Sequence, residues 1–144
     1  MSYCTIDDLK KALSETTLIT ITDDAGAGEV DEGKAQEAID DAAEEINAWI
    51  GGRVALPLAG TPPPILKKVC ADIAVWNLYS RVEFDTPKTW VERYRNAVKI
   101  LERFSKGEIT LGTQPIPDAP ASYSSGIRTS SRAKMFGTDT MDKY

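Results

Sequence analysis

The stretch DEGKAQEAIDDAAEEINAWIGG, residues 31–52, constrains the fold more strongly than any other part of the chain. At 100° per residue, its apolar side chains gather on one face of a helix and its acidic side chains on the opposite face. Acidic residues also crowd the first turns, where the helix dipole favours them. Gly51 follows the last apolar residue, as expected for a left-handed C-cap. The stretch therefore predicts a long amphipathic helix that needs other helices to cover its apolar face.

Three further segments predict helices that can supply this cover. The first, TIDDLKKAL, begins with Thr5 and Asp8 at the spacing of a capping box. The second, residues 65–82, follows three consecutive prolines, which suit the approach to a helix and its first turn. The third, residues 86–108, again carries its apolar side chains on one face.

Two short segments show no helical period. TTLITIT, residues 16–22, is rich in β-branched side chains and could form a brief extended piece, and ITLG, residues 109–112, could add a short strand. We therefore expect an all-α fold over residues 1–112, a small helical bundle of about four helices with short irregular or β pieces.

The segment 65–82 differs from the other predicted helices because it is apolar on two sides. A helix of this kind either lies at the centre of its bundle or is covered by a partner subunit. The second apolar stripe contains Val75, Leu78 and Val82. These three residues are therefore candidates for a subunit interface.

Asp72 lies at the edge of the apolar surface of the same predicted helix. A carboxylate in such a position needs a partner, and Arg53 and Arg81 are the candidates. We expect a structural ion pair that fixes the proline-punctuated loop 53–64 to the helix. Replacing Asp72 with alanine should then lower thermal stability or assembly.

The composition excludes several kinds of catalytic and metal chemistry. The chain contains no histidine, which removes Ser-His-Asp and Cys-His catalysis and histidine-bearing zinc sites. Cys4 and Cys70 are far apart in sequence, so no disulfide framework is indicated, and Cys70 is typical of a small buried hydrophobe. We expect no cofactor and no enzymatic activity.

The stretch TDDAGAGEVDEGK is similar to a calcium-binding EF-hand loop, with aspartates at positions 1 and 9 and glycine at position 6. However, Ala25, Ala27 and Lys34 stand at positions where such a loop supplies oxygen ligands. We therefore expect no bound metal. Gly28 and Val30 instead predict a sharp turn followed by an apolar plug ahead of the long helix.

The chain changes character after Gly112. Residues 113–144 contain three prolines, many serines and threonines, and no helical or strand period. The net charge of the chain is −5: residues 1–112 carry −6 and residues 113–144 carry +1. We expect a long extended C-terminal arm that orders on a partner; a disordered tail is the alternative. Its candidate contact residues are Tyr123, Ile127, Arg128, Arg132, Met135, Phe136 and Tyr144.

The net negative charge argues against a protein whose main task is to hold DNA, because phosphate binding depends on clustered lysine and arginine. The N-terminus lacks the apolar stretch of a secretory signal, and the run VCADIAVWNLY is too short to span a membrane. We expect a soluble protein that is made in a cytoplasm.

Several blocks of the sequence resemble the small head–tail-region protein of Mu-like phages and prophages. They are YCTIDDLKKAL near the start, GRVALPL at 52–58 and ADIAVWNLY at 71–79, in that order. The resemblance covers about residues 3–112. Many members of that family carry a fuller D-x-D-G-D-G loop where this chain has DDAGAG, so no metal role is carried over.

The resemblance implies a virion protein of the phage neck, a non-catalytic head–tail connector of the adaptor type. Such adaptors form homo-oligomeric rings, typically of about twelve copies, between the portal protein and a downstream neck or tail-completion protein. DNA passes through the lumen of the ring, and a C-terminal segment reaches into the portal. The alternatives are a stopper or head-completion protein of the same region, or, from another class, a DNA-packaging or DNA-binding accessory factor.

Overall fold

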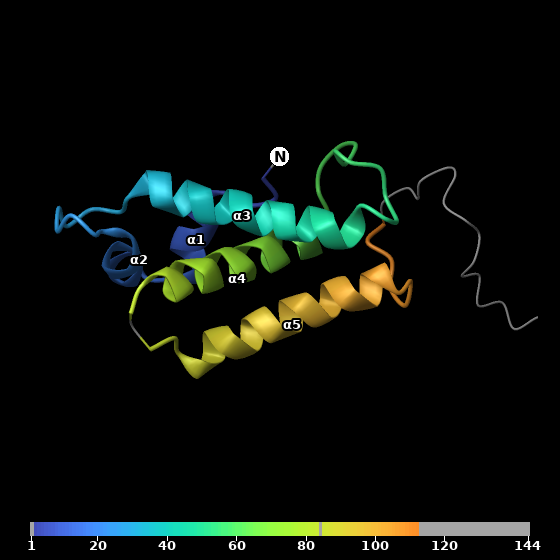
Figure 1. The fold of residues 1–144 in the computed structure, drawn as a ribbon. Coiled ribbons are helices and arrows are strands. Elements are labelled where there is room, and N and C mark those ends of the chain that lie inside the picture. Colours follow the sequence, from blue (N-terminus) through green and yellow to red (C-terminus); the bar gives the residue numbers. More distant parts are fainter. Residues whose placement is uncertain (1, 84, 113–144) are drawn as a thin grey trace, which may run out of the picture.

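The computed structural model describes residues 2–83 and 85–112 and contains five helices in this part of the chain (Figure 1). The helices are α1 (Ile6–Ala12), α2 (Glu15–Thr22), α3 (Glu32–Ile50), α4 (Pro64–Arg81) and α5 (Lys88–Ser105). The described residues contain no strand, so the expected all-α class is confirmed and the expected strand at 109–112 is wrong. The predicted arm, residues 113–144, lies outside the described residues.

The three long helices form the body of the domain. Figure 1 shows α4 between α3 and α5, while α1 and α2 lie at the side of α3 and α4. All five helices contribute to one hydrophobic core. The largest side chains that are fully buried in it are Leu9, Leu18, Ile21, Ile39, Ile46, Ile50, Leu66, Val69, Ile73, Val75, Leu78 and Leu101.

The central position of α4 explains its two apolar sides and corrects one prediction. Val75 is 0% exposed and Leu78 is 1% exposed within a single copy of the chain. Val82 is half-buried and packs against the same core. Val75 and Leu78 are therefore inside the bundle and offer no surface to another subunit, so their assignment to a subunit interface is wrong. The assignment of Val82 stays a prediction, because part of its side chain is accessible.

Helix α2 replaces the extended piece that was expected at residues 16–22. Its start is capped by Ser14, whose side chain accepts a hydrogen bond from the amide of Thr17. Thr22 donates its hydroxyl to the carbonyl of Leu18, which removes the cost of burying it. Burial of Leu18 and Ile21 then outweighs the strand preference of the β-branched residues.

Helix α3 has the predicted extent, but its last glycine is needed for a different reason. Gly51 has φ −60° and ψ −22°, which is right-handed, so the expected left-handed cap is wrong. A Cβ atom at Gly51 would lie 2.9 Å from the carbonyl oxygen of Asn47 and 3.2 Å from a methyl carbon of Leu56. Glycine is favoured there mainly because the Asn47 carbonyl of the same helix leaves no room for a Cβ atom, and the Leu56 side chain of the 53–64 loop crowds the position further.

The other predicted helix signals are confirmed. The carboxylate of Asp8 accepts hydrogen bonds from the amide and hydroxyl of Thr5, as in a capping box. Pro64 occupies the first turn of α4. Helix α5 buries Trp90, Ala97, Leu101 and Phe104 on one face.

Candidate functional site

The loop between α2 and α3 is closed by hydrogen bonds from its own backbone amides to the side chain of Asp23. Asp23 accepts hydrogen bonds from the amides of Ala27 at 3.0 Å and Gly28 at 2.7 Å. These bonds lower the pKa of the Asp23 carboxyl. Gly28 has φ +76°, which allows the sharp turn that was expected, and Val30 packs against the core behind it. Asp23 thus serves as an anchor for the turn.

The neighbouring carboxylate, Asp24, is held by two cations from other elements. Nη1 of Arg81, at the end of α4, lies 2.6 Å from Oδ2 of Asp24, and Nζ of Lys34, at the start of α3, lies 2.6 Å from the same atom. Arg81 also donates to the carbonyl of Ile21 at 2.7 Å. These hydrogen bonds, first from Arg81 and then from Lys34, hold the pKa of Asp24 far below its usual range. The cluster ties α2, α3 and α4 together at one end of the bundle.

Asp72 is paired, as the sequence predicted, but with a different residue. Its side chain is 6% exposed, and Oδ1 lies 2.9 Å from Nη2 of Arg93 on α5. The predicted partners are elsewhere, because Arg81 binds Asp24 and Arg53 lies beside Gly107. Asp72 therefore connects α4 to α5, and the expected tie to the 53–64 loop is wrong.

The Asp72–Arg93 contact is an ion pair without a well-aligned hydrogen bond. Within the described part of the chain, no donor forms a hydrogen bond to the buried Oδ1 atom. Burial raises the pKa of the Asp72 carboxyl, and the nearby charge of Arg93 only partly opposes the rise. The Arg93 guanidinium also lies 4.3 Å from the centre of the Trp90 ring, which fixes its position.

The two cysteines, which the sequence separates widely, meet in the core. Sγ of Cys4 donates to Sγ of Cys70 at 3.1 Å, and both side chains are buried as free thiols. This hydrogen bond, together with burial, raises the pKa of the Cys4 thiol. The contact holds the N-terminal segment against α4.

We predict that this contact can be trapped chemically. A disulfide needs the two sulfur atoms about 1 Å closer, which a small shift of the N-terminal segment can provide. Diamide, an oxidant that takes up the two thiol hydrogens, should therefore link Cys4 to Cys70 within one chain, as seen by non-reducing electrophoresis and peptide mass mapping. The Cys4→Ser variant should show no such link. If the native chain gave intermolecular disulfides and no link within one chain, the placement of the two cysteines would be contradicted.

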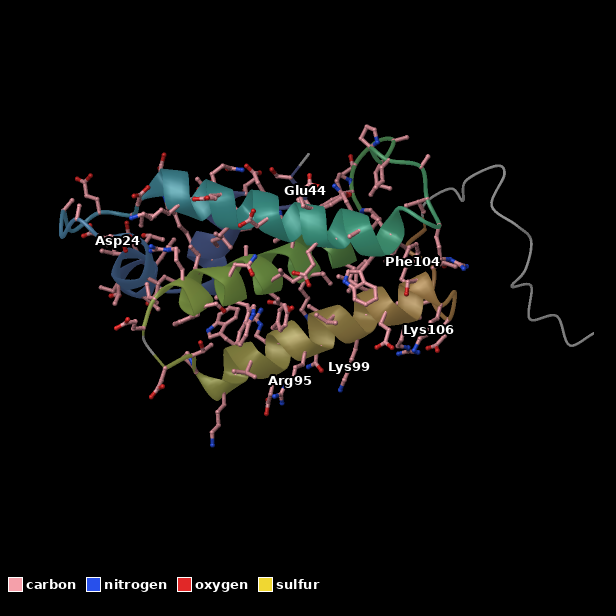
Figure 2. All side chains as sticks on the ribbon, viewed as in Figure 1. Asp24, Glu44, Arg95, Lys99, Phe104 and Lys106 are labelled. Carbon is pink, nitrogen blue, oxygen red and sulfur yellow. The ribbon has the colours of Figure 1, made fainter. Side chains whose placement is uncertain are left out.

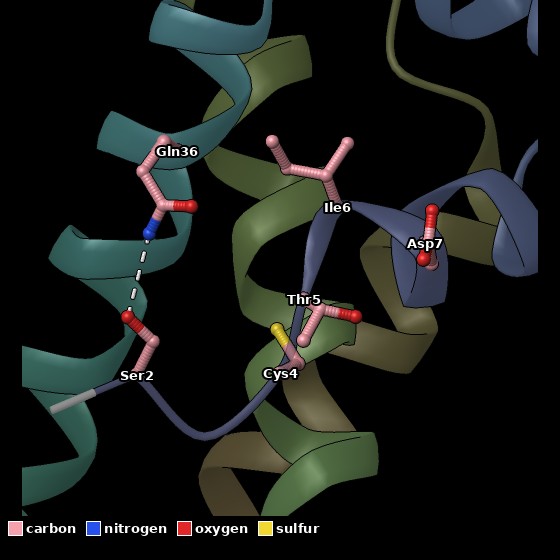
Figure 3. A pocket seen from close by; sticks show the side chains of 6 residues that line it. All are labelled: Ser2, Cys4, Thr5, Ile6, Asp7 and Gln36. Carbon is pink, nitrogen blue, oxygen red and sulfur yellow. Dashed lines mark hydrogen bonds between the residues drawn. The ribbon is translucent and has the colours of Figure 1, made fainter.

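A surface pocket of about 430 Å³ lies between the N-terminal segment and α3 (Figure 3). Gln36 donates to the hydroxyl of Ser2 across it at 3.4 Å. Its lining offers two titratable groups, Asp7 and the thiol of Cys4, and Cys4 is held by Cys70. Elsewhere in the described ranges, no group of three or more Cys, Asp or Glu side chains is arranged to hold a metal ion.

The predicted contact residues of the arm cannot be compared with the structure. Tyr123, Ile127, Arg128, Arg132, Met135, Phe136 and Tyr144 all lie outside the described residues. Sequence reasoning also missed Asp24 and Arg93, whose partners come from distant elements. Acidic side chains recur on the outer face of α3 and basic side chains on the outer face of α5, a pattern that the sequence already contains.

Comparisons with known proteins place the chain in a family. The family model described as "Bacteriophage Mu, Gp36" matches residues 3–128. The chain is 32% identical over 114 residues to the "Mu-like prophage FluMu protein gp36" of Haemophilus influenzae, covering 79% of this chain and 77% of that protein. It is 30% identical over 115 residues to "Gene product J" of Escherichia phage Mu, covering 79% of each.

The family match extends beyond residue 112, where the sequence resemblance ended, and so includes Tyr123, Ile127 and Arg128. Among the helices of the described residues, none combines the length and the apolar character required to cross a bilayer. The resemblance to a protein of Mu-like phages is confirmed by the family model and by both relatives. The chain belongs to the Bacteriophage Mu Gp36 family.

Proposed function

We propose that this protein is a structural, non-catalytic connector of the phage neck, an adaptor that joins the portal to the tail. The observation that carries the proposal is membership of a Mu phage family over residues 3–128. The geometry agrees with a structural role, because the buried or clustered charges join helices to one another. Asp24 and Asp72 each connect two or more helices.

The physical properties of the domain also suit a ring around a DNA channel. Its negative charge, −6 over residues 1–112, repels DNA phosphates and lets DNA slide without being held. Copies of the chain would form a homo-oligomeric ring, of about twelve subunits by analogy with phage adaptors. Its partners would be the portal on one side and a downstream neck or tail-completion protein on the other. The protein would then be found in the virion, at the head–tail junction.

We assign residues 113–144 to the contact with the portal. Spaced aromatic and apolar residues in a polar chain give anchors for binding, and the segment is long enough to reach beyond the helical body. The basic residues Arg128 and Arg132 add charge of opposite sign to the body.

A chain that ends at Gly112 should remain folded but fail to join the portal. The fold should persist because the described residues form a continuous core that extends from Tyr3 to Leu111. The measurements are circular dichroism with thermal melting for the fold, and mass spectrometry of purified particles in a complementation test. A chain with residues 113–144 scrambled is the matched control for arm length, and it should fail in the same way. Normal tailed particles from the truncated chain would contradict the assignment.

The same particles distinguish the alternatives. Cross-links to the portal support an adaptor, whereas cross-links only to tail-completion proteins support a stopper or head-completion protein. Absence of the protein from particles, combined with duplex DNA binding that falls steeply with salt, would instead support a packaging or DNA-binding factor.

A further inference from the structure

The outer face of α3 carries a stripe of acidic side chains. Helix α3 contains six acidic residues and one lysine. Glu37, Asp40, Asp41 and Glu44 recur every three or four residues and are exposed. Among residues 2–83 and 85–112, Glu37, Asp41 and Glu44 form no ion pair. Asp40 accepts hydrogen bonds from Ser2 and Gln36, whereas the charges of the other three are not used in ion pairs within this part of the chain.

The outer face of α5 carries the opposite charge. Helix α5 contains five basic residues and two glutamates, although the whole chain is acidic. Arg95, Lys99, Arg103 and Lys106 are exposed along it. Arg103 and Lys106 bind nearby Glu108 and Glu102, whereas Arg95 and Lys99 form no ion pair with any described residue.

The two charged faces point away from each other. Figure 2 shows Glu44 on the α3 side of the molecule, while Arg95 and Lys99 project from the far side of α5. Helix α4 lies between the two helices (Figure 1). A single copy therefore cannot bring these faces together, but a second copy can.

The two faces also match in length and spacing. Helix α3 has 19 residues and α5 has 18, so each is roughly 27–29 Å long. On both helices the charges recur at intervals of three or four residues, about one turn apart. Two such helices laid side by side can place Asp41 and Glu44 within reach of the two basic residues without an ion pair in the described part of the chain, Arg95 and Lys99.

We infer that the acidic face of α3 in one copy docks on the basic face of α5 in the next copy. The occupant of each face is another copy of this chain, argued from charge complementarity. Because the two faces differ, the contact is heterologous, and each copy uses both of its faces. Repetition of this contact produces a closed ring or an open filament. The assignment of the contact to a ring in the neck rests on the proposed function, but the contact itself does not.

Such a contact has a defined physical character. Exposed ion pairs are screened by salt, so self-association should weaken as the ionic strength rises. The charges set the orientation and partner choice of the copies more than the strength of their binding.

Two charge-reversal variants of the full chain test the inference. The first is Asp41→Lys/Glu44→Lys, which places two lysines of α3 opposite Arg95 and Lys99 of the next copy. The second is Arg95→Glu/Lys99→Glu, which places two glutamates of α5 opposite Asp41 and Glu44 of the next copy. Self-association of each variant alone should weaken at least tenfold in low salt, as measured by sedimentation and chemical cross-linking. An equimolar mixture should recover native association, because alternating copies again place opposite charges at every contact.

A control and a second measurement complete the test. Lys10→Glu/Lys11→Glu changes the net charge as much as the second variant does, but on α1, and should associate like the native chain. If the native chain is monomeric in solution, the same variants are compared for incorporation into particles, alone and coexpressed. Circular dichroism and thermal melting establish that each variant is folded.

The outcomes separate this inference from the proposed function. Native-like behaviour of either variant alone, or failure of the mixture to recover, overturns the α3–α5 contact. Loss of duplex DNA binding in Arg95→Glu/Lys99→Glu, with self-association unchanged, also overturns it and makes α5 a nucleic-acid surface. Recovery in the mixture without incorporation into particles supports the contact and overturns the neck connector.

Discussion

Replacing Leu78 with alanine will lower the free energy of unfolding of the isolated chain by about 2–5 kcal/mol. Leu78 is 1% exposed in the last turn of α4, so its removal leaves a cavity that neighbouring helices can fill only in part. Urea denaturation followed by circular dichroism measures the change. An effect of this size is a large fraction of the stability of a domain of this length.

The same experiment tests the corrected position of α4. If Leu78 were a subunit contact, its replacement would leave the stability of the monomer nearly unchanged and would weaken only assembly. Leu56→Ala is the matched control, because Leu56 is 39% exposed in the 53–64 loop and its truncation should cost well under about 1 kcal/mol. Equal effects of the two substitutions would contradict the structure.

Replacing Arg93 with alanine will lower the free energy of unfolding by about 2–3 kcal/mol at neutral pH. The substitution leaves the Asp72 carboxylate buried without its ion-pair partner. It also removes the guanidinium from the ring of Trp90. We expect a smaller loss in the free energy of unfolding than for a fully buried ion pair, because the Arg93 side chain is 38% exposed.

The cost of this substitution should shrink as the pH falls. The pKa of Asp72 is already raised in the folded protein, and loss of Arg93 raises it further. A carboxyl group with a raised pKa in the folded state favours folding when it is protonated, and this contribution is lost as the pH rises through the folded pKa. The difference between native and variant should therefore be largest at pH 7 and smaller near pH 4. Groups with lowered pKa values, such as Asp24, affect both proteins alike and cancel in the difference.

Two controls isolate the charge effect. Arg95→Ala removes an exposed arginine from the same helix and should change stability by less than about 0.5 kcal/mol. Asp72→Asn keeps the shape of the side chain without its charge, so it should cost less than Arg93→Ala and show little dependence on pH. A loss in Arg93→Ala that is the same at pH 4 and pH 7 would show that packing, and not charge, is responsible.

The long helices could be predicted from the sequence because their signals are local. The one-sided patterns of α3 and α5 and the proline start of α4 depend on spacing within one segment. Helix α2 could not be predicted in this way, since its β-branched residues favour a strand and only the burial of Leu18 and Ile21 decides the outcome. Local pattern and tertiary packing disagree there, and packing prevails.

The partners of charged and sulfur-bearing side chains could not be predicted for a related reason. A buried carboxylate such as Asp72 requires a cation, but helix periodicity does not say which distant element supplies it. The same holds for Cys4 and Cys70, which are 66 positions apart and in contact. Gly51 shows a third case, in which glycine is favoured by the close approach of the Asn47 carbonyl and the Leu56 side chain and not by a left-handed backbone conformation.

The α2–α3 loop is held closed by two cations, Lys34 and Arg81, that bind Asp24 and belong to the chain itself. A loop that is held by a dissolved ion opens when that ion is diluted or removed by a chelator, because closure follows the free ion concentration. Lys34 and Arg81 are covalently part of the chain, so their effective concentration at Asp24 is set by the fold. The loop can therefore keep its shape without any dissolved ion bound to it.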